Sequence, residues 1–309
     1  MNTNDQKPNI MNQFPHHDHG RRQFSAVPER LAASPGTAFT LTELLVVIGI
    51  AALLVSTLLP AFAKSRPTSQ AFQCLNNNRQ LCLAWRMYAD DNRDQIVYSS
   101  DDGRANANPL NQYAWTLTHL DFSGQNRPNW DTNLDIVQRP LWPYTGKNAS
   151  IYRCPADESF VMVNGVPTPR VRSVSMNIYL GGFAGTSGGW PFIEDSRIFL
   201  KTTDLTAPGP TKTFVFVEER WDAINWGNFL THMAGFPNNP ASYTFAEDFP
   251  GMIHDLACSF SFADGRAEMH RWQDPRTTPP VFGPGISDIV PSPRNLDVAW
   301  LQDHATRPK

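Results

Sequence analysis

The sequence has no excess of charge of either sign. Its 26 Lys and Arg residues nearly balance 29 Asp and Glu residues, which leaves a formal net charge of -3. Proteins that bind nucleic acid through the phosphate backbone carry a clustered basic surface, and their binding depends on it. Because that signature is absent, we expect no nucleic acid among the partners of this chain.

Cysteine is also scarce, and its spacing is not that of a metal-binding motif. The 309 residues contain four cysteines: Cys74, Cys82, Cys154 and Cys258. They form no C-x-x-C pair and no Cys/His cluster with zinc-finger spacing. By local spacing, the sequence therefore predicts no structural zinc and no metal ligands. An even number of cysteines is compatible with disulfides in an exported protein but does not require them.

The sequence lacks the H-E-x-x-H motif of zinc peptidases and the G-x-S-x-G motif of serine hydrolases. Four residues are candidates for a converging metal or acid–base site: His254, Asp264, Glu218 and Glu219. Asp264 is more simply explained as a turn residue, and His254 as a structural hydrogen-bonding residue. We therefore predict no catalytic residues and a protein that is not an enzyme.

Apolar residues are concentrated in one run. Residues 44–63 carry no formal charge, and at ~1.5 Å per residue a helix of this length covers a bilayer core of roughly 30 Å. The run is apolar on every face, which is typical of a membrane span. Residues 1–38 are polar and lack periodicity, so we expect them to be disordered, with arginines that favour the cytoplasmic side.

The segment 38–60, AFTLTELLVVIGIAALLVSTLLP, resembles the N-terminal signature of type IV prepilins and type II secretion pseudopilins. The family has Gly before the Phe, where this chain has Ala38. The resemblance implies that prepilin peptidase cuts between Ala38 and Phe39, and that Phe39 is then N-methylated. Glu43 becomes the fifth mature residue and would pair with the amino group of a neighbouring subunit during assembly. Pro60 occupies the position of a helix-kinking proline.

Further motifs resemble those of bacterial pseudopilin-like proteins. His254 is followed, after nine residues, by Asp264-Gly265, and Cys154 opens a C-P-A-D segment. The segment Cys74–Gln80, C-L-N-N-N-R-Q, is similar to the C-N-N-x-x-Q pattern of these proteins. Because Cys74 and Cys154 lie in these motifs, they are the first choice of partners if a disulfide forms. Four reduced core cysteines are an equally good interpretation.

These observations predict an α+β fold of the pilin type, in which a long N-terminal helix packs on an antiparallel β-sheet head. The expected helix has a transmembrane half at 39–63 and an amphipathic half at 64–94. The β-rich head covers 95–273. The tail, 274–309, is rich in proline and is expected to be loop or disorder. The leader, 1–38, would be removed.

Short apolar runs between turn signals predict strands at 95–99, 113–117, 151–154, 171–176, 213–218 and 256–263. Asp264-Gly265 predicts a two-residue hairpin turn after the last of these, which would place Phe262 opposite Ala267. We expect the sheet to pack on a helix through the apolar face of this strand. Cys258 is expected to be buried on that face.

One stretch has partial calcium-loop spacing: Asp90, Asn92, Asp94 and Asp101. It lacks the glycine of the sharp turn and the final Glu of such loops. A polar helix end is the preferred interpretation, with calcium as the alternative, and no other cofactor is expected.

We therefore interpret the chain as a non-enzymatic subunit of a pilin-like assembly. It would cross the bacterial inner membrane once, with a cytoplasmic N-terminus and a periplasmic or surface-exposed head. Its partners would be prepilin peptidase, other pilin-like subunits and the inner membrane. One alternative is an anchored envelope protein whose head binds carbohydrate or protein. Another is an anchored hydrolase, which would need a polar cleft around His254.

Overall fold

The computed structural model describes residues 40–103, 108–281 and 289–309, apart from the side chains of residues 57–68. The chain divides into two compact units, Met1–Val55 and Ser56–Lys309. The predicted leader, with the proposed cleavage site at Ala38 and Phe39, lies outside the described residues.

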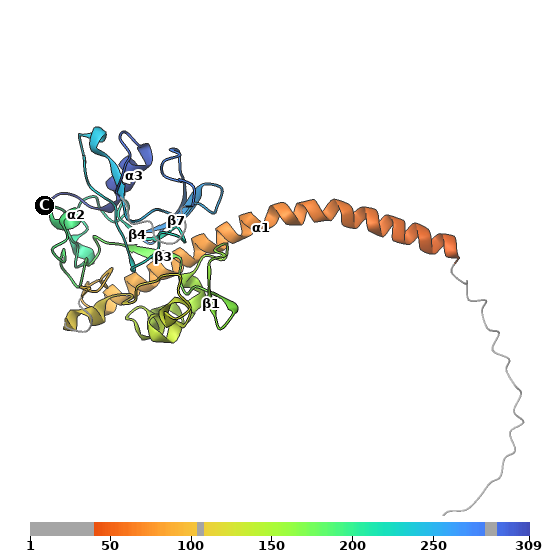
Figure 1. Ribbon diagram of the computed structural model, residues 1–309, viewed down its shortest axis with the longest axis horizontal. Helices are drawn as coiled ribbons and strands as arrows, with labels where there is room; N and C mark the ends of the chain where they lie inside the picture. The colour runs from red at the N-terminus through yellow and green to blue at the C-terminus, as the bar shows by residue number, and fades with distance from the viewer. Residues whose placement is uncertain (1–39, 104–107, 282–288) are drawn as a thin grey trace, which may run out of the picture. The chain divides into compact units, whose positions relative to one another are not determined.

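The described residues form α-helices, short 3₁₀-helices and β-strands (Figure 1). The α-helices are α1 (Leu41–Asp91), α2 (Pro191–Glu194) and α3 (Leu296–Ala305). The strands are β1 (Phe160–Val163), β2 (Val166–Pro169), β3 (Val174–Asn177), β4 (Phe214–Glu218), β5 (Asn228–Phe229), β6 (Thr244–Ala246), β7 (Ala257–Phe262), β8 (Ala267–Arg271) and β9 (Ile289–Pro291). The 3₁₀-helices are Pro109–Tyr113, Arg127–Asn129, Thr132–Leu134, Ile136–Gln138, Trp142–Thr145, Ala149–Tyr152, Thr202–Asp204 and Pro240–Ser242.

The structure is α+β, but the predicted fold with a transmembrane half is wrong. Among the described residues, no helix is long and apolar enough to cross a membrane. The helix itself is continuous from Leu41 to Asp91, and neither Pro60 nor Pro67 interrupts it.

The second half of α1 buries a single stripe of side chains. Its members are spaced one to four residues apart and lie on one helix face. They are Cys74, Asn78, Leu81, Cys82, Ala84, Trp85, Tyr88 and Ala89. Phe72, two residues before this stripe, is 68% exposed. The buried face begins with Cys74 and Asn78, and both contact Ser259 of β7.

The main sheet has the strand order β5-β3-β4-β7-β8. Neighbouring strands are antiparallel except for the parallel pair β3 and β5. One face of this sheet forms a hydrophobic core with the buried stripe of α1, through residues such as Val174 and Val215. The other face forms a second core with α3, through residues such as Phe260 and Leu301. The sheet therefore lies between the two helices (Figure 1).

The hairpin between β7 and β8 exists, but its predicted register is wrong by one residue. Ser261, not Phe262, is opposite Ala267. The loop has three residues, because Phe262 pairs with Arg266 and the N–H of Gly265 donates to the carbonyl of Phe262. Gly265 adopts a φ of 94°, the left-handed conformation that such a three-residue loop requires. Within β7 the serines face α1, where Ser259 contacts Asn78, and the phenylalanines face α3. The shift changes only which residues of β8 lie beside them.

Three of the predicted strands are confirmed: those at 171–176, 213–218 and 256–263 correspond to β3, β4 and β7. The runs at 95–99 and 113–117 meet only in an isolated bridge between Tyr98 and Ala114. The run at 151–154 overlaps the 3₁₀-helix Ala149–Tyr152 instead. These misassigned runs are apolar because they are buried, and burial alone does not select a strand.

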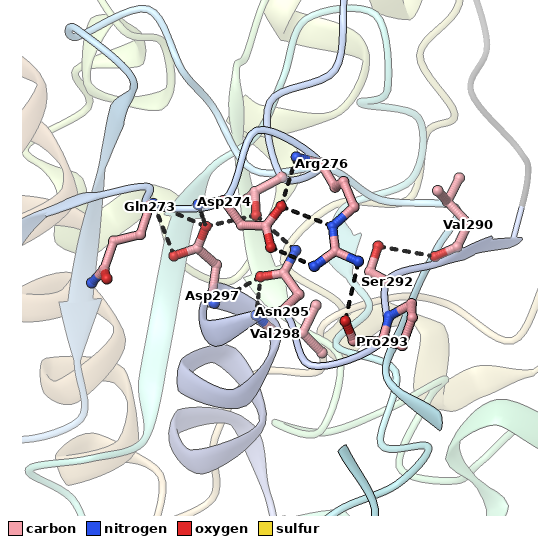
Figure 2. A network of polar contacts seen from close by, with 10 residues as sticks. Gln273, Asp274, Arg276, Val290, Ser292, Pro293, Asn295, Asp297 and Val298 are labelled. Carbon is pink, nitrogen blue, oxygen red and sulfur yellow. Dashed lines mark hydrogen bonds and ion pairs between the residues drawn. The ribbon is translucent and has the colours of Figure 1, made fainter. Parts of the chain in front are cut away.

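The C-terminal tail was expected to be loop, and this was wrong for its last part. The helix α3 begins after Asn295, whose side chain accepts hydrogen bonds from the N–H groups of Asp297 and Val298. The buried carboxylate of Asp297 in turn accepts from the N–H groups of Gln273 and Asp274. Figure 2 shows how this network joins the start of α3 to the segment that follows β8.

The face of β7 that α3 covers should control the stability of the head. Phe260 is fully buried, and its ring centroid lies 4.9 Å from that of Trp300 and 5.4 Å from that of Phe214. We predict that Phe260→Ala lowers the free energy of unfolding by about 3–5 kcal/mol, because it leaves a cavity among aromatic rings. Chemical denaturation of the full-length chain, followed by tryptophan fluorescence, measures this change.

Phe160 provides a matched control, since its side chain is 51% exposed. Phe160→Ala should change the free energy of unfolding by less than about 0.5 kcal/mol. Equal stability of the two variants would contradict the packing described for β7.

Candidate metal centre

Four metal-ligating side chains meet inside the head, each from a different segment. Cys74 lies on α1, Cys154 follows the 3₁₀-helix Ala149–Tyr152, Glu218 ends β4, and His254 precedes β7. One ligand atom from each residue lies within 4.8 Å of all the others. Across the described ranges of the chain, no other group of three or more His, Cys, Asp and Glu residues is arranged in this way.

The closest approaches converge on a common centre. The Cys154 Sγ lies 3.1 Å from the His254 Nε2. The same Nε2 lies 3.4 Å from the Glu218 Oε2, which in turn lies 3.3 Å from the Cys74 Sγ. All four residues are at most 9% exposed. The cluster is therefore enclosed by protein.

The backbone around Glu218 explains why the end of β4 lies so close to the segment that leads to His254. The N–H of Gly251 donates to the carbonyl of Glu218 at 2.7 Å. A Cβ atom at position 251 would lie 2.9 Å from the Glu218 Cγ, so a side chain there would displace the carboxylate. After His254, Asp255 and Leu256 both adopt a φ of 56°. This left-handed turn leads the chain from His254 directly into β7.

The two cysteines are held by further hydrogen bonds. The Cys154 N–H donates to the Ser173 Oγ at 2.7 Å, and the N–H of Ala156 donates to the Cys154 Sγ at 3.4 Å. The Cys74 Sγ lies 3.1 Å from the Ser259 Oγ. Both sulfur atoms are therefore fixed in position by groups that are not themselves part of the cluster.

The electrostatics favour the charged forms of Cys154 and His254 and the neutral thiol of Cys74. The hydrogen bond with Cys74 and the contact with His254 lower the pKa of Cys154, although burial and Glu218 oppose them. For His254, burial lowers the pKa, but its hydrogen bonds with Cys154 and Glu218 outweigh burial and raise the pKa to about 10. The hydrogen bond with Cys154, burial and the charge of Glu218 raise the pKa of Cys74.

The geometry does not favour a catalytic relay. In such a relay the histidine uses one ring nitrogen for the nucleophile and the other for the orienting carboxylate. Here the thiol of Cys154 and the carboxylate of Glu218 both approach the Nε2 of His254. One ring nitrogen cannot accept a proton from one group while it donates to the other. The arrangement suits ligands that point at one ion.

Access to the cluster is also poor. A cavity next to Glu218 has room for about 20 Å³, which is enough for a water molecule but far from the size of a substrate pocket. A groove of about 520 Å³ passes Cys154, but neither Glu218 nor His254 lines it. The polar cleft that the hydrolase alternative needs around His254 is not found there.

The structure separates the four candidate residues, His254, Asp264, Glu218 and Glu219. His254 and Glu218 do meet, whereas the Asp264 carboxylate accepts from the N–H of Arg266 within the hairpin turn. Glu219 is buried apart from the cluster, where burial and the nearby Asp248 raise its pKa. Asp264 and Gly265 therefore act as turn residues, as the sequence predicted.

The structure brings two of the four cysteines together. Cys74 and Cys154, the expected disulfide partners, contribute to the same cluster, but all four cysteines are free thiols. Cys258 is fully buried on the face of β7 that also carries Phe260, which confirms its predicted position. Cys82 is buried against β7, where its thiol donates to the carbonyl of Phe262.

Two other predicted sites have local structural roles. Within the described residues, the acids of the partial calcium loop do not gather into a cluster, and the Asp94 carboxylate accepts from the hydroxyl of Thr202. The Glu43 carboxylate accepts from both the N–H and the hydroxyl of Thr40, while the Thr40 hydroxyl accepts from the N–H of Glu43. These contacts form a capping box at the start of α1.

Comparison with protein-family models, with curated proteins and with solved structures found no match to this chain. The interpretation of the cluster therefore rests on its geometry.

Local spacing could not have identified the complete cluster. Each ligand comes from a segment that contributes only one, and the folded sheet brings the segments together. The available signals were the burial of Cys74 in a helical stripe and the position of Glu218 at the end of a strand. Neither signal reveals which other segment lies opposite.

The free state of the cysteines is testable. We predict that the full-length chain, unfolded in the presence of a chelator and without reductant, reacts with a thiol reagent at four sites per chain. The native chain should react far more slowly, because all four thiols are buried. Two reactive thiols after unfolding would instead indicate a disulfide, and peptide mapping would show whether it joins Cys74 to Cys154.

Proposed function

We propose that this protein is a non-enzymatic subunit of a pilin-like assembly, in which copies associate through the first part of α1. One observation carries the proposal: residues 41–55 form a helix whose apolar side chains are exposed on every face. Large exposed apolar surfaces on soluble chains mark places where another molecule binds. The prepilin-like signature around this segment suggests that the partner is the same segment of other subunits.

The exposed surface is continuous around the helix. Its large side chains are each between 53% and 76% exposed: Leu41, Leu44, Leu45, Val46, Val47, Ile48, Ile50, Leu53, Leu54 and Val55. A helix that packs against one surface needs a single apolar stripe. An all-round apolar surface fits a helix that is surrounded by several neighbours, as a bundle of subunit helices would provide.

The capping box at the start of α1 adds a second role for Glu43. Within one chain, its carboxylate accepts from Thr40 and so completes the first turn of the helix. A carboxylate has lone pairs for more than two donors. Glu43 can therefore cap its own helix and still accept from the Phe39 amino group of a neighbour. Cleavage by prepilin peptidase, which would create that amino group, rests on the resemblance of residues 38–60.

The contribution of the charge of Glu43 can be separated from the cap. Glu43→Gln keeps a carbonyl oxygen that can accept from Thr40, but removes the negative charge. We predict that it lowers the yield of cross-linked oligomers by roughly tenfold or more, because a hydrogen bond to a charged group contributes about 1.5–3 kcal/mol. Chemical cross-linking of two differently tagged full-length copies in the native host measures this yield.

Thr40→Val is the matched control, because it removes the capping hydroxyl and keeps the charge of Glu43. It should assemble like the wild-type chain. Mass spectrometry of each mature N-terminus would verify that both variants are processed at Phe39. If Glu43→Gln assembles normally, the filament hypothesis loses its support. If both variants lose assembly equally, the cap rather than the charge is responsible.

A second candidate function is supported by a pocket on the head. This pocket of about 340 Å³ combines aromatic rings with carboxyl groups, the combination that carbohydrate-binding sites use to stack sugars and to bind hydroxyls. Its lining includes Phe183, Trp190, Trp226, Asp101, Glu247 and Asp248. Of the nine tryptophans, Trp226 is 36% exposed at this pocket, whereas Trp85 and Trp115 are core residues. The pocket favours a head that binds carbohydrate.

The pocket can be tested with neutral oligosaccharides of glucose and of N-acetylglucosamine as probes. If it binds sugars, the tryptophan fluorescence of the full-length chain should change on titration. Trp226→Ala should then weaken binding by roughly tenfold, because it removes about 1.5 kcal/mol of stacking. Trp221→Ala changes a half-buried tryptophan outside this pocket and should leave binding unchanged. A wild-type chain that responds to none of the probes argues against this function.

A further inference from the structure

We propose that Cys74, Cys154, Glu218 and His254 bind one structural Zn²⁺ ion that fastens α1 to the head. This inference does not depend on the pilin-like function, because it concerns only the folded head and the helix that packs on it.

The identity of the ligands selects the metal. Thiolate and imidazole ligands favour zinc over hard cations such as Ca²⁺ and Mg²⁺, which prefer oxygen ligands. Two thiolates, one imidazole and one carboxylate provide the four ligands of a tetrahedral site. A closed set of four protein ligands is typical of a structural ion, whereas a catalytic ion keeps one position open for water or substrate.

The distances between the ligand atoms fit a tetrahedral zinc site. Zn–S bonds of about 2.3 Å and Zn–N or Zn–O bonds of about 2.0–2.2 Å place neighbouring ligand atoms about 3.3–3.8 Å apart. The separations of 3.1, 3.3 and 3.4 Å among the atoms of the cluster are close to this range. These three contacts link the four ligand atoms in the order Cys154, His254, Glu218 and Cys74. One ion placed among these atoms is therefore within reach of all four.

Unsatisfied groups in the cluster also indicate an ion. The Glu218 Oε1 is buried and has no hydrogen-bond partner, although an unpaired buried carboxylate oxygen is costly. The Nε2 of His254 is approached by a thiol and a carboxylate at the same time. A divalent cation among these atoms would compensate the buried negative charge and occupy the Nε2 lone pair.

The groups next to the two sulfur atoms are typical of thiolates that bind a metal ion. The N–H of Ala156 donates to the Cys154 Sγ, and the hydroxyl of Ser259 lies within hydrogen-bond distance of the Cys74 Sγ. Hydrogen bonds of this kind stabilise the charge on metal-bound thiolates and fix the orientation of the ligands. They come from residues that do not themselves bind the ion.

The ion would connect segments that are far apart in the sequence. Cys74 is separated by long stretches of chain from the other three ligands, all of which belong to the head. Cross-linking distant segments stabilises a fold by restricting the unfolded chain. The ion would therefore hold α1 in register on the sheet, beside the contacts of Asn78 with Ser259.

The test is the metal content of the full-length chain, purified under reducing conditions from cells supplied with Zn²⁺. Mass spectrometry of the elements should find about one zinc per chain, and little iron or copper. After removal of the metal, Co²⁺ should bind in its place and give the visible spectrum of a tetrahedral thiolate complex. Chelation should lower the thermal midpoint of the wild-type chain.

Two serine variants on α1 provide a matched pair. Cys74→Ser removes a ligand and should lower the zinc content by roughly tenfold or more. Cys82→Ser changes an equally buried cysteine on the same helix face and should keep the ion. Glu218→Gln keeps the shape of the side chain and should also lose zinc, since an amide is a poor ligand.

Measurements on the wild-type chain decide the proposal even if a variant fails to fold. A chain that holds no zinc after reconstitution with Zn²⁺, or that contains a Cys74–Cys154 disulfide, would overturn it. Equal zinc contents in Cys74→Ser and Cys82→Ser would overturn it as well.

Discussion

The close packing of α1 on β7 is the contact on which the rest of the head depends. Ser259 and Ser261 face the helix, and their small side chains allow the helix and the strand to approach closely. Asn78 uses this proximity to donate to the carbonyl of Ser259, and Cys82 donates to that of Phe262. The buried stripe of α1 then fills one core of the sheet. The same contact brings Cys74 to the position where the other three ligands meet.

The nine residues between His254 and Asp264 have a structural explanation. Between these two residues lies β7, with a tight turn at each end. His254 faces the cluster where the strand begins, and Asp264 with Gly265 reverses the chain where it ends. The spacing is therefore fixed by the length of one strand. A residue inserted between them would either change the register of β7 or move the histidine away from Glu218.

The sequence predicted the elements with strong local patterns and missed those decided by tertiary contacts. The alternation in β7 and the helical stripe of α1 identified both elements. The hairpin register was missed because Asp264-Gly265 fits both a two-residue and a three-residue loop, and hydrogen bonding selects the longer one. The helix α3 was missed because its proline-rich surroundings suggested loop. Of the cluster, His254 and Glu218 were candidates, but only folding shows that two cysteines join them.

The position of α3 has a consequence for how the chain acquires its structure during synthesis. The first described helix covers one face of the main sheet, and the last covers the other. The phenylalanines of β7 have no complete cover until residues 296–305 have left the ribosome. A nascent chain with every strand of the main sheet but without α3 exposes an aromatic surface that is prone to aggregation. A stop before residue 296 therefore leaves one face of the sheet without its cover and the head incomplete.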